Sequence, residues 1–414
     1  MINLEVPRKF GMLVRLAHQA AGEVFRPISR KYDLAEHTYP RELDMFAAVV
    51  DGMQASGQGS GAGARGVRRA ADTATDTAVN PVADLDADGG VRNGTNLSSV
   101  LSIMEMCWGD VGLLLSMPRQ GLGNSAIASV ATDEQQARFA GKWAAMAITE
   151  PGCGSDSAAI TTTARLDGDH YVLNGEKIFV TAGERADAVV VLATLDRSRG
   201  RGAIKSFVVE KGTPGLTVVG CEDKLGIRAS DTATLHLADC RVPKENLLGT
   251  PDIDQGFAGV MQTFDNTRPL VAAMAVGVAR AALEQTRSLL RDAGVEVDYD
   301  RTPYTQHAAA AAYLAMESDW EAAYLLTLRA AWMADNNKPN SLQASMAKAK
   351  AGRVAVEITL RCVELAGSVG YGERELLEKW ARDAKILDIF EGTQQIQQLI
   401  VARRILGKSS AELK

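Results

Sequence analysis

The feature that most constrains the fold is a β-rich stretch enclosed by two helical ones. From residue 147 to about 248 the chain alternates short apolar runs with the dipeptides Asp167-Gly168 and Asn174-Gly175, which favour tight hairpin turns between strands. The residues before and after this stretch carry apolar side chains at helical spacing. We therefore predict an α+β chain with an N-terminal helical domain (1–145), a central antiparallel β-barrel domain (146–254) and a C-terminal four-helix bundle (255–414).

The N-terminal part contains an unusual insert. Residues 10–32 and 98–115 both show helical spacing, and between them residues 55–92 are rich in Gly, Ala and Asp with few large apolar side chains. Such a segment buries too little apolar surface to offset the entropy lost on ordering. The sequence therefore predicts a mobile excursion between two helical segments.

Composition excludes several classes of protein. The net charge of -6 is spread along the chain without a basic stripe, so we expect no nucleic-acid partner. The five cysteines and five histidines lack metal-ligand spacing, which predicts reduced thiols and no metal site. No apolar run approaches the roughly 20 residues that span a bilayer, and charges interrupt the N-terminal segment where a signal peptide is apolar. A cytoplasmic protein without a membrane span is the expectation.

A glycine-rich loop opens the β-rich part. Residues 147–156 read "AITEPGCGSD". Gly152 and Gly154 allow a tight turn that presents backbone amides, while Thr149 and Ser155 add hydroxyl groups. Such a loop can hold a flavin ring edge and a pyrophosphate without a positive side chain. The alternative is a β-turn that binds nothing.

Two further motifs follow. The segment "GEKIFVTAG" at 175–183 has a strand pattern in which Phe179, taken alone, is an inward-facing core residue. The segment "EKWARDAKILDIFEGTQQIQ" at 378–397 has a helical pattern that is interrupted at 390–393. Locally, Gly392 would end one helix and Thr393 would cap the next. Glu391 would then be an ordinary carboxylate at a corner.

The domain order and these motifs together resemble the acyl-CoA dehydrogenase family over nearly the whole chain. The glycine-rich loop matches the family's Thr-Glu-Pro-Gly-x-Gly-Ser-Asp signature at each position. The C-terminal motif resembles its Arg-Asp-Ala-Lys…Tyr-Glu-Gly-Thr segment, with Phe390 where tyrosine is common. A third stretch, "FDNTRP" at 264–269, looks like the family's Phe-Asp-x-Thr-Arg-Pro. The resemblance implies an FAD-dependent enzyme.

The resemblance also implies residue roles. In the medium-chain type of these enzymes the glutamate at this corner is the catalytic base, which assigns that role to Glu391. Relatives that carry the base on the helix of "FDNTRP" would have it at Thr267, a residue type that cannot act as a base. The implied FAD contacts are Thr149, Gly154, Ser155, Phe179, Val180, Thr181, Thr393 and Gln395. The implied substrate contacts are Ser155, Asp265, Arg268 and Gly392. For Asp265, capping of a helix is the plain alternative.

The implied reaction is the α,β-dehydrogenation of an acyl-CoA thioester to the trans-2-enoyl-CoA, as in β-oxidation. Glu391 removes the α-proton while the β-hydrogen leaves as hydride to the flavin. By family precedent the backbone N–H of the glutamate stabilises the developing enolate. Substrate binding should dry the site and raise the pKa of Glu391. An electron-transferring flavoprotein would accept the electrons.

Two elements that homotetrameric members lend to a neighbouring subunit are altered here. The expected Arg-x-x-Phe-Gly segment is missing after Arg291, and the Gln-x-x-Gly-Gly-x-Gly element reads "ELAGSVG" at 364–370. Glu364 thus places a carboxylate where a pyrophosphate is expected, which is electrostatically unfavourable. We infer a heteromeric α2β2 enzyme in which a paralogous subunit supplies the FAD clamp. A homotetramer whose clamp has moved, to Arg301 for example, is the alternative.

Other functions stay open at this level. An acyl-CoA oxidase or a flavin monooxygenase would use the same scaffold, and a non-catalytic partner subunit would not need a placed base. The family's Pro-Glu-x-x-Gly-Gly loop in the N-terminal domain is absent, so the shape of the acyl pocket does not follow by analogy. The sequence leaves open the acyl chain length and the choice between CoA and an acyl carrier protein.

Overall fold

The structure is a computed structural model that describes residues 6–55, 93–118, 121–252, 256–409 and 412. For residues 49–55 and 256–266 it describes the backbone alone. The insert predicted to be mobile, at 55–92, lies almost wholly outside the described residues.

The N-terminal part is helical. Its helices are α1 (Gly11–Ala20), α2 (Arg26–Leu34), α3 (Glu42–Ala55), α4 (Thr95–Gly109), α5 (Val111–Ser116), α6 (Leu122–Val130) and α7 (Asp133–Arg138), and a π-helical turn at Ala21–Phe25 joins α1 to α2. Asp110 separates α4 from α5, because its side chain accepts the N–H of Leu113 at 2.8 Å and so caps α5. The helices predicted at 10–32 and 98–115 are confirmed.

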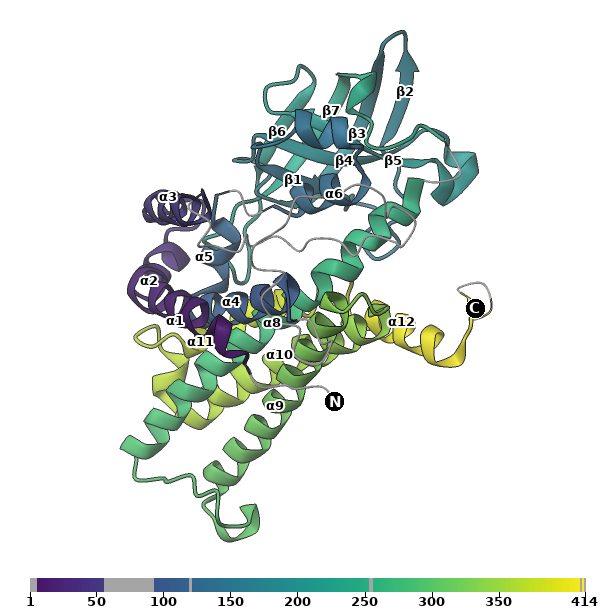
Figure 1. Cartoon of the computed structure of the whole chain (residues 1–414). Coiled ribbons are helices and arrows are strands. Elements are labelled where there is room, and N and C mark those ends of the chain that lie inside the picture. The colour runs from purple at the N-terminus through teal and green to yellow at the C-terminus, as the bar shows by residue number, and fades with distance from the viewer. Residues whose placement is uncertain (1–5, 56–92, 119–120, 253–255, 410–411, 413–414) are drawn as a thin grey trace.

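The central part is a single curled sheet of seven strands that lies above the helices (Figure 1). The strands are β1 (Ala144–Ala147), β2 (Thr163–Asp167), β3 (His170–Thr181), β4 (Ala188–Thr194), β5 (Ile204–Glu210), β6 (Leu216–Cys221) and β7 (Thr232–Pro243). Their order is β1-β4-β2-β3-β7-β6, and β5 pairs with β4. Most pairs are antiparallel, as predicted, but β4 runs parallel to both β1 and β2. The sheet is therefore mixed.

One of the two predicted hairpin turns is wrong. Asp167-Gly168 does form the tight turn between β2 and β3. Asn174-Gly175 instead lies inside β3, at a shift in its register with β7 between Leu173 and Gly175. Gly175 is required there, because its φ is 154° and a Cβ would lie 2.4 Å from Thr162 Oγ1. The dipeptide marks a bulge that bends the strand.

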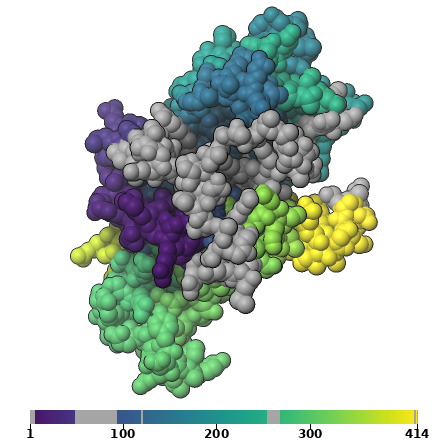
Figure 2. All heavy atoms as spheres, viewed as in Figure 1, coloured from purple at the N-terminus to yellow at the C-terminus, as the bar shows by residue number. Residues whose placement is uncertain are grey.

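The C-terminal part is a helical bundle. Its helices are α8 (Gly256–Asp292), α9 (Ala308–Asp335), α10 (Ser341–Tyr371), α11 (Leu377–Leu387) and α12 (Gln394–Leu406). Small buried residues such as Ala272, Ala275 and Ala279 of α8 allow neighbouring helices to approach closely. The helix α12 projects from the side of the bundle (Figures 1 and 2). None of the helices in the described part of the chain is both long and apolar enough to cross a bilayer.

The sheet is fixed to the bundle through the loop that joins β6 to β7. In this loop the backbone N–H of Ile227 donates to Asp383 Oδ1 at 2.5 Å, and Leu225 O accepts from Arg382 Nη1 at 3.1 Å. Gly226 lies so close to α11 that a Cβ would be 2.5 Å from the backbone of Arg382. These contacts set the position of the sheet relative to the C-terminal helices.

Candidate active site

The chain turns sharply between α11 and α12. Glu391 has φ 54° and Gly392 has φ 94°, both in the left-handed region. For a glutamate this conformation costs about 1–2 kcal/mol. Thr393 then caps α12, because its side chain accepts the N–H of Ile396 at 3.4 Å. The predicted corner and cap are present, although α11 already ends at Leu387.

The Glu391 carboxyl group faces the protein interior. Its Oε2 is buried and has no hydrogen-bond partner among the described residues. Burial raises the pKa of Glu391, while a hydrogen bond with Thr267 of α8 and the charges of Lys348 and Arg268 partly oppose the rise. A buried carboxyl group with a free oxygen and a raised pKa is suited to accept a proton.

Two buried side chains hold the backbone of this turn. Lys348 of α10 donates from Nζ to Gly392 O at 2.7 Å. Gln397 of α12 donates from Nε2 to Glu391 O and to Gly392 O, both at 3.1 Å. Both side chains belong to fully buried residues, and burial lowers the pKa of Lys348 to about 8. The carbonyl groups of the strained turn are thus fixed from the interior side.

The glycine-rich loop follows β1. Glu150 and Cys153 exchange backbone hydrogen bonds of 3.0 and 3.1 Å, and Thr149 O accepts the N–H of Ile178 at 2.9 Å, which ties the loop to β3. Neither Gly152 nor Gly154 has a positive φ. A Cβ would meet nothing within 4 Å at Gly152 and only Thr149 Cγ2, at 3.9 Å, at Gly154.

A tight turn is therefore not what requires these two glycines. Neither the turn nor the packing of the described residues requires them, and the space in front of the loop is open. Glycine at such positions allows a bound group to approach the backbone closely. Gly154 and Ser155 are both exposed at this surface.

A buried ion pair fixes the base of the loop. Glu150 accepts from Lys177 Nζ at 2.7 Å and from the backbone and hydroxyl groups of Thr161 and Thr162 at 2.6–3.0 Å. Burial alone would raise the pKa of Glu150, but the hydrogen bonds from Lys177 and Thr162 bring it down to about 2. Sequence reasoning missed this pair, although its two members lie in the two quoted motifs of the β-rich part.

Phe179 lies beside the loop in an unusual conformation. Its φ is 55°, and its position falls within a register shift between Lys177 and Val180 where β3 pairs with β7. Phe179 is 57% exposed, whereas Val180 is buried and Thr181 is half-buried. The reading of Phe179 as an inward-facing core residue is therefore wrong. An exposed aromatic in a strained bulge indicates a surface prepared for a ligand.

The remaining predicted residues lie in the C-terminal helices. Arg268 of α8 is buried close to Glu391, Thr393 is half-buried and Gln395 is exposed. Asp265 lies in α8, but its side chain is outside the described residues. The structure thus gathers the predicted residues into two clusters, one on β1 and β3 and one at the turn before α12.

Sequence comparison identifies the family. Residues 145–240 match the family model of the acyl-CoA dehydrogenase middle domain, and residues 254–406 match that of the acyl-CoA dehydrogenase C-terminal domain. The chain belongs to the acyl-CoA dehydrogenase family.

Two curated relatives illustrate the extent of the match. The chain is 43% identical over 269 residues to the mitochondrial short-chain specific acyl-CoA dehydrogenase of Mus musculus, covering 63% of this chain and 62% of that one. It is 36% identical over 324 residues to the short-chain specific acyl-CoA dehydrogenase of Clostridium acetobutylicum, covering 76% of this chain and 84% of that one. The match thus spans less than two thirds of the mouse relative.

Solved structures confirm the fold class. Butyryl-CoA dehydrogenase from Megasphaera elsdenii has a TM-score of 0.81 at 29% identity, covering 98% of this chain and 100% of that one. A chain from a structure of the electron transferring flavoprotein of Acidaminococcus fermentans has a TM-score of 0.80 at 32% identity, with the same coverage.

The site fits the cofactor of this family. Acyl-CoA dehydrogenases are FAD-dependent flavoproteins. A planar ring needs an apolar surface and close backbone approach, which the exposed Phe179 and the open space at Gly152 and Gly154 provide. These features would accommodate the cofactor, and the packing of the described residues does not itself require them.

The elements that depart from the family pattern are exposed. Glu364 lies near the C-terminal end of α10 and is paired with Arg361. The helix is kinked a short distance later, at Gly367, whose φ is 57°. Arg291 is exposed, and Arg301 is paired with Asp298 at 3.3 Å. The side chains of Glu364, Arg361, Arg291 and Arg301 are all exposed on the isolated chain.

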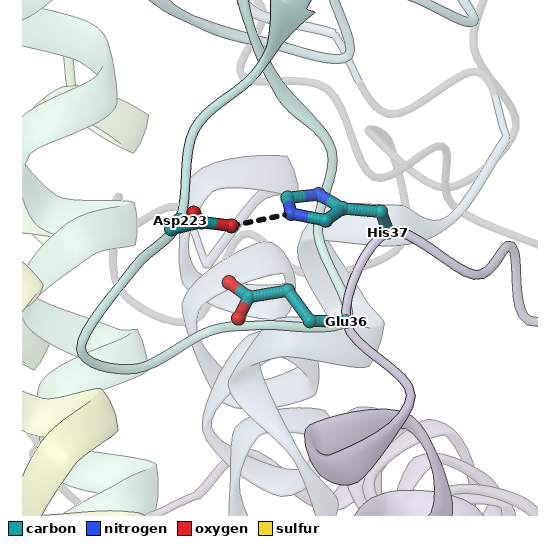
Figure 3. A group of neighbouring side chains, drawn as sticks. All are labelled: Glu36, His37 and Asp223. Carbon is teal, nitrogen blue, oxygen red and sulfur yellow. Dashed lines mark hydrogen bonds and ion pairs between the residues drawn. The ribbon is translucent and has the colours of Figure 1, made fainter.

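Figure 3 shows the one grouping of His, Asp and Glu side chains in the described part of the chain that could reach a common ion: Glu36, His37 and Asp223. His37 Nε2 lies 2.9 Å from Asp223 Oδ1. Glu36, however, accepts the backbone N–H of Lys224 at 2.9 Å and lies 3.7 Å from Arg228. A metal ion would compete with this N–H group and with the Arg228 guanidinium, so we interpret the group as a contact between the end of α2 and the β6–β7 loop.

Sequence reasoning also missed the residues that hold the Glu391 turn. Lys348 and Gln397 were assigned no role, and Thr267 was considered only as a position that lacks a base. A signal for Lys348 did exist, because it shares the buried face of α10 with Ala344 and Ala351. A single lysine on an alanine stripe at helical spacing is out of pattern.

Proposed function

We propose that this chain is an FAD-dependent acyl-CoA dehydrogenase that converts an acyl-CoA thioester to the trans-2-enoyl-CoA, with Glu391 as the catalytic base. The observation that carries the proposal is the Glu391 carboxyl group in its strained turn: its Oε2 is buried without a hydrogen-bond partner among the described residues, and burial raises its pKa. The names of the relatives support the same chemistry.

The chain's own groups account for the proton transfer. Glu391 Oε2 takes the proton from the α-carbon, and its raised pKa makes it a stronger base toward a weakly acidic C–H bond. The backbone N–H of Glu391 would donate to the thioester oxygen, where negative charge develops. FAD, when bound, supplies the acceptor for the hydride that leaves the β-carbon, so that the electron pair of the α-C–H bond forms the double bond.

Residues around these groups would hold cofactor and substrate. The proposed FAD contacts are Thr149, Gly154, Ser155, Phe179, Val180, Thr181, Thr393 and Gln395. The proposed substrate contacts are Ser155, Asp265, Arg268 and Gly392. The relatives named for short-chain and butyryl substrates favour butyryl-CoA as the first substrate to test. A role in β-oxidation, electron transfer to an electron-transferring flavoprotein and a cytoplasmic location are part of the same proposal.

The proposed assembly is an α2β2 heteromer in which a paralogous subunit completes the FAD site. It is supported by the missing Phe-Gly segment and by the acidic Glu364 in the second neighbour-facing element. The exposed apolar residues Leu399, Ile405 and Leu406 on the projecting α12 offer surface for another subunit. We expect the chain alone to retain little FAD and co-expression with the partner to restore it. Full flavin occupancy in a homotetramer of this chain would contradict the heteromer.

Glu391→Gln tests the reaction. Substitution removes the base but keeps the side-chain shape, so anaerobic reduction of the flavin by butyryl-CoA should slow by about 10³-fold. Glu357→Gln, an exposed carboxylate of α10, is the matched control and should reduce at the wild-type rate.

The same experiment separates the other functions. A non-catalytic partner subunit would give a complex whose reduction rate is insensitive to Glu391→Gln. For the reduced wild-type enzyme, fast reoxidation by oxygen would favour an oxidase or monooxygenase, and slow reoxidation supports the dehydrogenase.

A further inference from the structure

Lys348 is a buried lysine whose hydrogen-bond acceptor is a backbone carbonyl. Its residue is fully buried on α10, and Nζ donates to the backbone carbonyl of Gly392 at 2.7 Å. Among the described residues, no carboxylate oxygen lies within ion-pair distance of Nζ, whereas the buried Lys177 and Lys379 are paired with Glu150 and with Asp110 and Asp383. Burial of a charge without a close counter-ion is unfavourable. A fold that only needed an apolar contact here would use an apolar residue.

The charged groups that face Lys348 come from two neighbouring elements. Glu391 and Asp388 belong to the turn after α11, and Arg268 belongs to α8. Glu391 is also affected by the charges of Lys348 and Arg268. The ammonium group therefore acts on the Glu391 carboxyl group through the electric field, without an ion pair that would occupy Oε2.

Gln397 allows the effect of the hydrogen bonds on the turn to be separated from the effect of the charge. It donates to Glu391 O and Gly392 O at 3.1 Å each, so it holds the Gly392 carbonyl that Lys348 also holds, and the Glu391 carbonyl besides, without carrying a charge. A Cβ on Gly392 would lie 2.5 Å from Gln397 Nε2, which shows how closely the amide packs against the turn.

We propose that Lys348 is a positioning residue for Glu391: it fixes the turn through the Gly392 carbonyl and, beside Arg268, supplies buried positive charge that favours ionisation of Glu391. Gln397 shares the first task only. The inference rests on the proposed role of Glu391 as the base and adds the group that sets its ionisation.

The proposal has a definite consequence for pH dependence. A nearby positive charge favours the carboxylate, so loss of that charge must raise the pKa of Glu391 further. Burial lowers the pKa of Lys348 itself to about 8. Lys348 therefore carries its charge at neutral pH and loses it in mildly alkaline solution.

Four variants separate field from geometry. Lys348→Met removes charge and donor at similar volume, and Lys348→Gln removes the charge but keeps an amide donor. Gln397→Leu removes a donor without changing any charge. Lys350→Met is the matched control, because Lys350 lies on the same helix but forms a surface pair with Asp319.

The primary readout needs no turnover. In the flavin-loaded enzyme without substrate, the infrared C=O band of a protonated carboxylic acid is followed against pH and assigned to Glu391 by its loss in Glu391→Gln. We expect the midpoint to rise by about 1 pH unit in both Lys348 variants. It should stay at the wild-type value in Gln397→Leu and Lys350→Met. The acidic limb of the flavin-reduction rate should move by the same amount.

The outcomes distinguish this inference from the proposed function. An unchanged midpoint in Lys348→Met and Lys348→Gln would overturn it, as would failure of both variants to fold, since Lys348 would then serve the fold itself. If only Lys348→Met fails to fold, Lys348→Gln decides. Undiminished flavin reduction in Glu391→Gln would instead defeat the proposed function, whatever the infrared midpoints show.

Discussion

Two fully buried lysines in the C-terminal helices have opposite surroundings. Lys379 of α11 lies 2.7 Å from Asp110 Oδ2 and 2.5 Å from Asp383 Oδ2. Lys348 of α10 has the Gly392 carbonyl as its hydrogen-bond acceptor and no carboxylate within ion-pair distance in the described part of the chain. Burial lowers the pKa of a lysine in both places, but the two carboxylates reverse this for Lys379 and raise its pKa. For Lys348 the lowering prevails.

The difference separates a structural network from the proposed catalytic site. The two aspartates of the first cluster also accept backbone N–H groups, from Leu113 of α5 and Ile227 of the β6–β7 loop, so the cluster joins three parts of the molecule. At the second cluster, the described residues provide no hydrogen-bond partner for Glu391 Oε2 and no carboxylate within ion-pair distance of Lys348 Nζ. Local features that oppose stability concentrate at functional sites.

The largest expected effect is on the structural lysine. Lys379→Met leaves Asp110 and Asp383 buried without their cation, so we expect the free energy of unfolding to fall by about 3–5 kcal/mol. Urea denaturation of the flavin-loaded enzyme measures it. Lys350→Met is the control for loss of a surface lysine. A loss below about 1 kcal/mol would mean that the two clusters do not differ as described.

The opposite sign is expected for the other lysine. Lys348→Met removes the unfavourable burial of a charge. We expect this gain to outweigh the loss of one hydrogen bond and the reduced ionisation of Glu391. The free energy of unfolding should therefore rise by about 1–2 kcal/mol near pH 7. In the wild-type protein, the free-energy cost of burying the Lys348 charge is fully present below the folded pKa of about 8. It decreases as the pH rises from there toward the ordinary lysine pKa of 10.5. The gain should therefore shrink between pH 8 and 10.5 in the same denaturation assay. A destabilised variant at pH 7 would break the comparison.

Glu391→Gln should also raise the free energy of unfolding, by on the order of 1 kcal/mol at neutral pH. Because burial raises the pKa of Glu391, the folded protein holds this proton above the ordinary pKa of 4.5, and wild-type stability falls as the pH rises through the folded value. Glutamine has no such titration. The gain should therefore vanish near pH 4 and grow toward neutrality, which thermal unfolding at several pH values can follow. A gain independent of pH would mean that a change in packing or hydrogen bonding of the side chain, and not relief of charge burial, is responsible.

What could be predicted from the sequence follows a similar division, between local patterns and contacts that join distant segments. Domain order and the Glu391 corner were predictable because they depend on local period, turn residues and a dense motif. Asn174-Gly175 was misread because a bulge and a hairpin favour the same dipeptide, and only the approach of Thr162 separates them. Phe179 was misread because strand alternation fails at a bulge. Lys348, Gln397 and the Glu150–Lys177 pair depend on contacts between distant segments, which no single window of sequence contains.

The smallest expected effect on stability concerns Phe179, and it extends the comparison to the sheet. Phe179 is 57% exposed and strained at φ 55°, so its ring contributes little to the core, whereas the equally strained Glu391 is half-buried and has its Oε2 atom in the interior. Phe179→Ala should change the free energy of unfolding of the FAD-free chain by less than about 0.5 kcal/mol. If the ring packs on the flavin, the same variant should weaken FAD retention by about tenfold, the scale of one aromatic stacking contact.

Phe207→Ala, which removes a fully buried ring of the same sheet, is the control and should lower the free energy of unfolding by about 3–5 kcal/mol. Loss of stability in Phe179→Ala with unchanged flavin binding would mean that the ring serves the fold. The proposed ligand-binding surface would then be limited to the Glu391 turn.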